Sequence, residues 1–133
     1  SQAFYRDELW RGIGFSSLED FLVRNWEANF SRRDPSDLLA QLWTWQHGDI
    51  SACERFGGDL PAALRAISAR VLLMPGDHDL YFRTEDNRRE LAHLRHGELR
   101  PIPSVWGHRA GNPVQNPADA EFIRVAVHSL LSE

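Results

Sequence analysis

The chain has 133 residues, of which 42% are hydrophobic and 26% are charged, and its formal net charge is −4. This length and composition are typical of one globular domain with its own core. The negative charge and the lack of a basic run count against a nucleic-acid partner, and no stretch approaches the roughly 18 apolar residues of a membrane span. A lone cysteine, Cys53, excludes a disulfide framework and favours a reducing compartment, so we predict a cytoplasmic protein.

The first half of the chain is predicted to be helical. Ser17 is a typical N-cap for a helix over residues 18–30, because Glu and Asp follow in its first turn. Asp34-Pro35 marks the start of a second helix by the same logic of a cap followed by proline, and that helix is expected to break near Gly48.

The second half alternates between strands and helices. The apolar run Val71–Met74, stopped by Pro75-Gly76, is typical of a strand buried on both faces of a parallel sheet. The predicted elements are a strand over 70–75, a helix over 84–95, a strand over 98–103 and a helix over 117–131. This order predicts a parallel pair of strands with a right-handed crossover.

Two strands make a poor sheet, and an apolar strand such as Val71–Met74 requires neighbours on both sides. The sequence also begins without methionine. We therefore expect the C-terminal part of a larger doubly wound α/β enzyme. Its missing strands would be cut away or supplied by another chain, so we expect association with an N-terminal half or a homo-oligomer.

The loop after the first strand carries a candidate catalytic carboxylate. Asp79 follows Gly76 at the edge of the sheet where α/β enzymes place their working groups, and a carboxylate there can orient a histidine. Asp77 is a rival that spacing does not separate from Asp79. The alternative for Asp79 is a structural one, in which it caps a turn or the helix that follows.

The loop after the second strand carries a candidate general base. His108 follows Gly107 in the segment Ser104–Gly111, and an acid and a histidine on neighbouring strand-end loops form the second half of a Ser-His-Asp triad. The alternative is a surface histidine. The spacing of the Asp and His residues in these loops matches no metal-ligand motif, so we expect no metal and no bound cofactor.

A third group of candidates lies near the end of the second predicted helix. Trp43 and Trp45 are too far apart around a helix to share one face, so one of them is expected to face a cavity or a partner. His47 and Asp49 are also candidates for lining a pocket. The alternative for this segment is helix packing and an ordinary helix end at Gly48.

The nucleophile that a triad requires is missing from the sequence. No Gly-x-Ser-x-Gly occurs, and Ser16, Ser17 and Ser104 lack the flanking glycines and the strand-to-helix setting of a nucleophile elbow.

Four segments together resemble the C-terminal half of homoserine O-acetyltransferase-like α/β-hydrolases. They are Leu38–Ser51, Ala63–Ile67, Val71–Phe82 and Ile102–His108, within a resemblance that covers about residues 15–131. The resemblance implies a helical lid over residues 1–60, which often forms a dimer contact, and a C-terminal α/β-hydrolase portion over 61–133. It also implies that Asp79 is the triad acid, that His108 is the base and that Tyr81 lies at the substrate pocket.

In that family an upstream serine takes an acyl group from acyl-CoA, a co-substrate, and passes it to an alcohol or to water. The present sequence departs from the family pattern at Phe82-Arg83, where a proline is typical, and after His108. The acceptor therefore stays open. We predict part of a serine-triad acyltransferase or hydrolase that binds a small-molecule acyl donor and acceptor. The alternative is a non-catalytic assembly or binding module.

Overall fold

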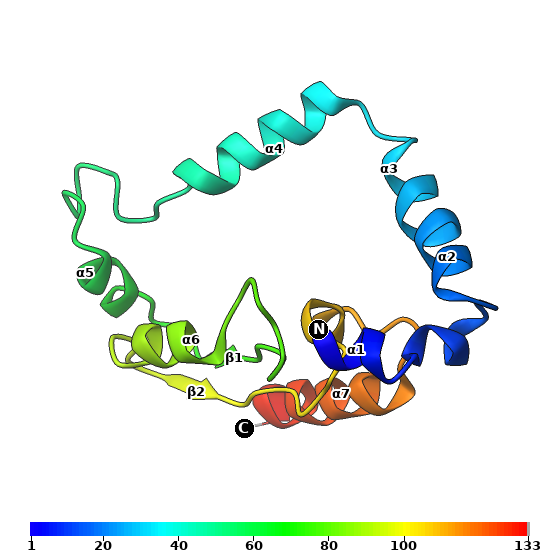
Figure 1. Cartoon of the computed structure of the whole chain (residues 1–133). Helices are drawn as coiled ribbons and strands as arrows, with labels where there is room; N and C mark the ends of the chain where they lie inside the picture. The colour runs from blue at the N-terminus through cyan, green and yellow to red at the C-terminus, as the bar shows by residue number, and fades with distance from the viewer. Residues whose placement is uncertain (133) are drawn as a thin grey trace.

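The computed structural model of the chain describes residues 1–132 (Figure 1). Its elements, in chain order, are α1 (Gln2–Arg6), η1 (Leu9–Ile13), α2 (Leu18–Phe21), η2 (Leu22–Glu27), α3 (Ala28–Phe30), α4 (Pro35–His47), α5 (Leu60–Arg65), β1 (Val71–Leu73), α6 (Thr84–Leu91), β2 (Gly97–Leu99), η3 (Gly107–Gly111) and α7 (Pro117–Ser132).

The two strands pair in parallel, with Leu72 opposite Glu98, and α6 forms the crossover between them. Both strands are shorter than predicted, because prolines interrupt the hydrogen-bonding ladder just beyond each strand. Pairing resumes at an isolated bridge between Gly76 and Ile102. The α/β class, with two parallel strands and helices as in the C-terminal part of an α/β-hydrolase sheet, is therefore confirmed.

The caps predicted for the helical half are present. Ser17 Oγ accepts a hydrogen bond from the backbone N–H of Asp20 at 3.0 Å, and Asp34 Oδ1 accepts one from Ser36 at 2.7 Å. The predicted helix over 18–30 contains a π-helical segment, η2, between α2 and α3. The helix predicted over 84–95 ends at Leu91.

The buried core of the helical half extends to the loop that carries His108. Phe4, Trp10 and Phe21 form this core, and Trp106 packs against it, with a distance of 5.3 Å between the ring centroids of Phe4 and Trp106. Figure 1 accordingly shows α1 beside the segment that leads into α7. The domain boundary near residue 60 stays a prediction.

Helix α4 has 13 residues, and none of them is buried. It lies on the far side of the wide arc that the chain describes between α3 and α5 (Figure 1). Among residues 1–132, no helix combines the length and apolarity needed to cross a membrane.

Candidate active site

Two loops bring the candidate acid and base together. Asp79 lies in a tight turn after β1, closed by a 2.9 Å hydrogen bond from its N–H to the carbonyl of Gly76. His108 is the second residue of the short helix η3, which begins soon after Ile102, the residue that pairs with Gly76. Both loops leave the carboxyl ends of parallel strands, so they meet at one edge of the sheet.

The two side chains are hydrogen-bonded. His108 Nδ1 lies 2.9 Å from Asp79 Oδ2, and Asp79 Oδ1 accepts a 2.8 Å hydrogen bond from the N–H of Tyr81. The Asp79 side chain is only 5% exposed, whereas that of His108 is 54% exposed. The carboxylate is therefore held rigidly beneath an imidazole that solvent or a substrate can reach.

The surroundings of Asp79 favour its ionised form. Burial alone would raise its pKa, but hydrogen bonds from His108 and from the N–H groups of Tyr81 and Phe82 outweigh burial, and the pKa lies below its ordinary value of 3.8. An ionised carboxylate only accepts hydrogen bonds, so Nδ1 of His108 must be the donor. This tautomer leaves Nε2 with its lone pair free, as a general base requires.

Two glycines allow the loops to lie this close. A Cβ on Gly76 would lie 2.8 Å from the carbonyl oxygen of Gly107 and 3.2 Å from the Cβ of Ala110. Gly107 adopts a φ of 61°, in the left-handed region that glycine tolerates best. A Cβ there would approach His78 O to 3.2 Å. The backbone contact between the two loops therefore depends on both glycines.

Aromatic rings surround the imidazole of His108. Tyr81 lies edge-on to it at 5.1 Å between centroids, and Phe82 lies at 5.4 Å. Trp45 from α4 approaches the same two rings, at 6.4 Å from Tyr81 and 6.0 Å from Phe82. One side chain of the predicted lid segment thus reaches the rings that flank the candidate base.

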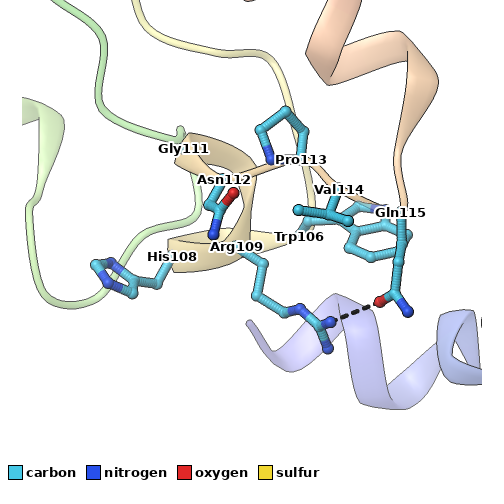
Figure 2. Close-up of a pocket in the computed structure, with 8 residues that line it drawn as sticks. All are labelled: Trp106, His108, Arg109, Gly111, Asn112, Pro113, Val114 and Gln115. Carbon is cyan, nitrogen blue, oxygen red and sulfur yellow. Dashed lines mark hydrogen bonds between the residues drawn. The ribbon is translucent and has the colours of Figure 1, made fainter.

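His108 borders three hollows on the surface, the smallest of which, about 290 Å³, also has Asp79 in its lining. A hollow of about 580 Å³ is formed by the segment around η3, and Figure 2 shows His108 at its edge, with its side chain directed away from that of Arg109. A second hollow of about 460 Å³ is mainly apolar and aromatic. Its lining includes Phe4, Tyr5, Phe21, Trp26, Tyr81 and Trp106. The second hollow suits an uncharged organic group next to the base.

The other predicted pocket residues lie apart from this pair. Trp43 and His47 stack on each other at 4.4 Å within α4, and Asp49 accepts hydrogen bonds from the N–H and hydroxyl of Ser51. Asp77, the rival carboxylate, forms a backbone hydrogen bond to Ile102, while Asp79 takes the place beside His108. Of the pocket candidates, Trp45 and Tyr81 are the two near the base.

Arg109 is a contributor to the site that the sequence did not single out. Its guanidinium lies over the rings of Phe4 and Trp106 and donates a 2.7 Å hydrogen bond to Gln115 (Figure 2). Burial lowers the pKa of Arg109. These contacts hold Arg109, the residue next to His108, against α1. Phe4 is far from Arg109 in the sequence, so only the fold brings the two together.

Within residues 1–132, no serine or cysteine side chain hydrogen-bonds to His108, and no group of three or more His, Cys, Asp or Glu residues is arranged to hold a metal. The described site therefore contains an oriented base and its carboxylate partner without the hydroxyl on which they would act.

The chain is similar to known ester hydrolases. It is 39% identical over 108 residues to a probable esterase of Corynebacterium glutamicum and 36% identical over 108 residues to the ethyl acetate hydrolase of Pseudomonas veronii. These matches cover 81% of this chain, which spans only 30% of the length of each relative. No protein family model matches the chain.

Solved structures give the same picture over the whole chain. An acetylester hydrolase from Corynebacterium glutamicum superposes with a TM-score of 0.91 at 34% identity, and the acetyl esterase MekB does so with 0.91 at 32%. All of this chain is covered, but only 37% and 38% of those two structures. The chain has the fold of part of an α/β-hydrolase, and its relatives are ester hydrolases.

Proposed function

We propose that this chain supplies the acid and the base of a serine-hydrolase triad that acts on esters of short acyl groups. The observation that carries the proposal is the 2.9 Å hydrogen bond between His108 Nδ1 and the buried, ionised Asp79. In this arrangement Nε2 would take the proton of a serine hydroxyl during attack on the ester carbonyl and then return it to the departing alcohol. A water molecule would next be activated in the same way to release the acid.

The nucleophilic serine would come from a part of the protein outside residues 1–133. The relatives are about three times as long as the present chain, which leaves ample room for such a part. The mainly apolar hollow beside His108 supports an apolar acyl or alcohol group as the preferred substrate. The relatives include an ethyl acetate hydrolase and an acetyl esterase, which supports a small acyl group.

A more specific form of the same proposal is that an alcohol, and not water, accepts the acyl group. The Asp79–His108 pair would activate an alcohol as readily as water once the serine is acylated. Acyl-CoA as donor and homoserine as acceptor rest on the resemblance of the sequence alone. The ratio of ester to acid formed in the presence of a competing alcohol would separate the two reactions.

The test uses the protein that carries the nucleophile together with the present chain. We expect His108→Ala to lower the rate of acetyl-ester hydrolysis by about 10³-fold or more, and Asp79→Asn by about 10²- to 10⁴-fold. His128→Ala is the matched control, because His128 is exposed on α7 and its side chain lies within hydrogen-bonding distance of Ser132 and not of the site.

Near-normal hydrolysis by the His108→Ala variant would contradict the proposal. An inert protein, unlabelled by a serine-directed phosphonate and found as a defined oligomer, would favour the alternative of an assembly module. The observation behind that alternative is α4, whose Leu39 and Trp43 are 66% and 62% exposed.

A further inference from the structure

A second buried polar cluster lies beneath the His108 loop. Ser104, just upstream of His108, and Asp119, in the first turn of α7, are 5% and 6% exposed. Asp119 Oδ2 accepts a 2.6 Å hydrogen bond from the Ser104 hydroxyl and a 2.7 Å hydrogen bond from Nδ2 of Asn116. The described site has no catalytic use for either residue.

This cluster connects α7 to the backbone that leads to His108. The hydroxyl oxygen of Ser104 also accepts a 3.2 Å hydrogen bond from the N–H of Trp106, two residues before His108. The carbonyl of Ser104 lies 3.3 Å from Nδ1 of His78, in the loop that carries Asp79. Ser104 therefore contacts both loops of the site, and Asp119 orients the Ser104 hydroxyl.

Asp119 itself is held in place by Asn116 and by the first turn of α7. Asn116 Oδ1 accepts hydrogen bonds from the N–H groups of Ala118 and Asp119, at 3.2 and 3.4 Å, which closes the first turn of the longest helix described. Burying a carboxylate is unfavourable unless hydrogen bonds compensate it. An apolar side chain could fill the position of Asp119, but it could not orient the Ser104 hydroxyl. The hydrogen bonds of Asp119 therefore indicate that it positions Ser104.

We propose that Asp119 is a positioning residue, which acts through Ser104 to hold His108 at hydrogen-bonding distance from Asp79. The expected effect of Asp119 on the hydrolysis rate rests on the proposed function. Its expected effect on the Asp79–His108 hydrogen bond does not. Loss of Asp119 would free the Ser104 hydroxyl to rotate, release the N–H of Trp106 and let the His108 loop shift. A shift of about 1 Å in a catalytic group can cost about 10²-fold in rate.

The first measurement is independent of activity. A proton shared between His108 Nδ1 and Asp79 should give a low-field ¹H resonance in the complete protein, and loss of that resonance in His108→Ala and in Asp79→Asn would assign it. We expect Asp119→Ala to shift or broaden the resonance beyond detection. Asp119→Asn should restore most of it, because the amide oxygen can still accept from Ser104.

The second measurement is the hydrolysis rate per active site, with the sites counted by a serine-directed covalent inhibitor. Asp119→Ala should lower kcat by about 10- to 100-fold and change KM by less than about threefold, since the base is displaced whereas most rings of the apolar hollow, among them Phe4, Phe21 and Trp26, lie on other elements. Asp59→Ala is the matched control. Asp59 also accepts a hydrogen bond from the first turn of a helix, at 2.9 Å from Ala62 N, but α5 does not contribute to the site.

The proposal is overturned if Asp119→Ala lowers thermal stability yet leaves both the resonance and the rate per active site unchanged. If that variant does not fold, Ser104→Ala removes the same hydrogen bond to Asp119 with a smaller loss of stability. It must then give the same change in the resonance and in the hydrolysis rate. If the wild-type protein hydrolyses no ester, the proposed function fails and the resonance alone decides the role of Asp119.

Discussion

Asp79 is the residue on which the site depends most, because it is buried, charged and bonded to both loops. Its hydrogen bonds from His108 and Tyr81 compensate the cost of burial. A carboxyl group whose pKa is lowered by folding stabilises the folded state at pH values above its ordinary pKa. That contribution disappears as the pH falls through the lowered value, because the folded protein must then take up the proton.

We therefore predict that the difference in stability between wild type and Asp79→Asn is constant near neutral pH and shrinks below about pH 4. Thermal unfolding of both proteins across that range measures it. His108→Ala serves as the comparison, because it removes the side-chain donor to Asp79 and should reduce the pH-dependent part. A difference that grows on acidification would show that the pKa of Asp79 is raised by folding.

At the scale of elements, the site depends on how closely two strand-end loops pack. The loop after β1 and helix η3 lie close together at Gly76, where an added Cβ would meet the backbone of Gly107 and the Cβ of Ala110. Such a contact has little room to adjust, because its neighbours are backbone atoms and not the ends of flexible side chains.

We expect Gly76→Ala to displace η3 and lower ester hydrolysis by about 10- to 100-fold, with a loss of about 1–3 kcal/mol in stability. Gly12→Ala is the control, since a Cβ at Gly12 would meet no described atom within 4 Å apart from its chain neighbours and its own helix. Hydrolysis rates and thermal melts of both variants test this. Equal effects of the two substitutions would contradict the role given to the Gly76 contact.

At the scale of the whole molecule, a distant helix reaches the site through one side chain. Trp45 and Trp43 lie on the same helix and are similarly exposed, at 58% and 62%. Only Trp45 approaches the rings of Tyr81 and Phe82 beside His108. The two tryptophans therefore form a matched pair for testing whether α4 covers the site.

We predict that Trp45→Ala lowers kcat/KM for an acetyl ester by about 2- to 10-fold, the usual worth of one or two aromatic contacts, and that Trp43→Ala changes it by less than about twofold. Steady-state kinetics on the two variants measure this. Equal values of kcat/KM for the two variants would contradict a role of Trp45 in the site.

Much of the fold follows from local patterns in the sequence. The caps at Ser17 and Asp34 and the apolar run at Val71 place the principal helices and the first strand, because capping and burial are determined by neighbouring residues. The positions of Asp79 and His108 after their strands follow from the alternation of strands and helices in the second half of the chain. The prediction of a helix over 18–30 did not include the π-helical segment η2. The predicted strands included Pro75 and Pro101, although prolines in the sequence mark where a ladder is interrupted.

The choice of Asp79 over Asp77 was decided only by the tertiary structure. Both carboxylates have the same local setting, and a turn of the backbone directs one of them at His108. The approach of Trp45 and the bond from Ser104 to Asp119 were likewise invisible, because residues that meet in space are separated by long stretches of chain. The sequence by itself determined which chemical groups stand at the strand ends, whereas their distances and protonation depend on long-range contacts.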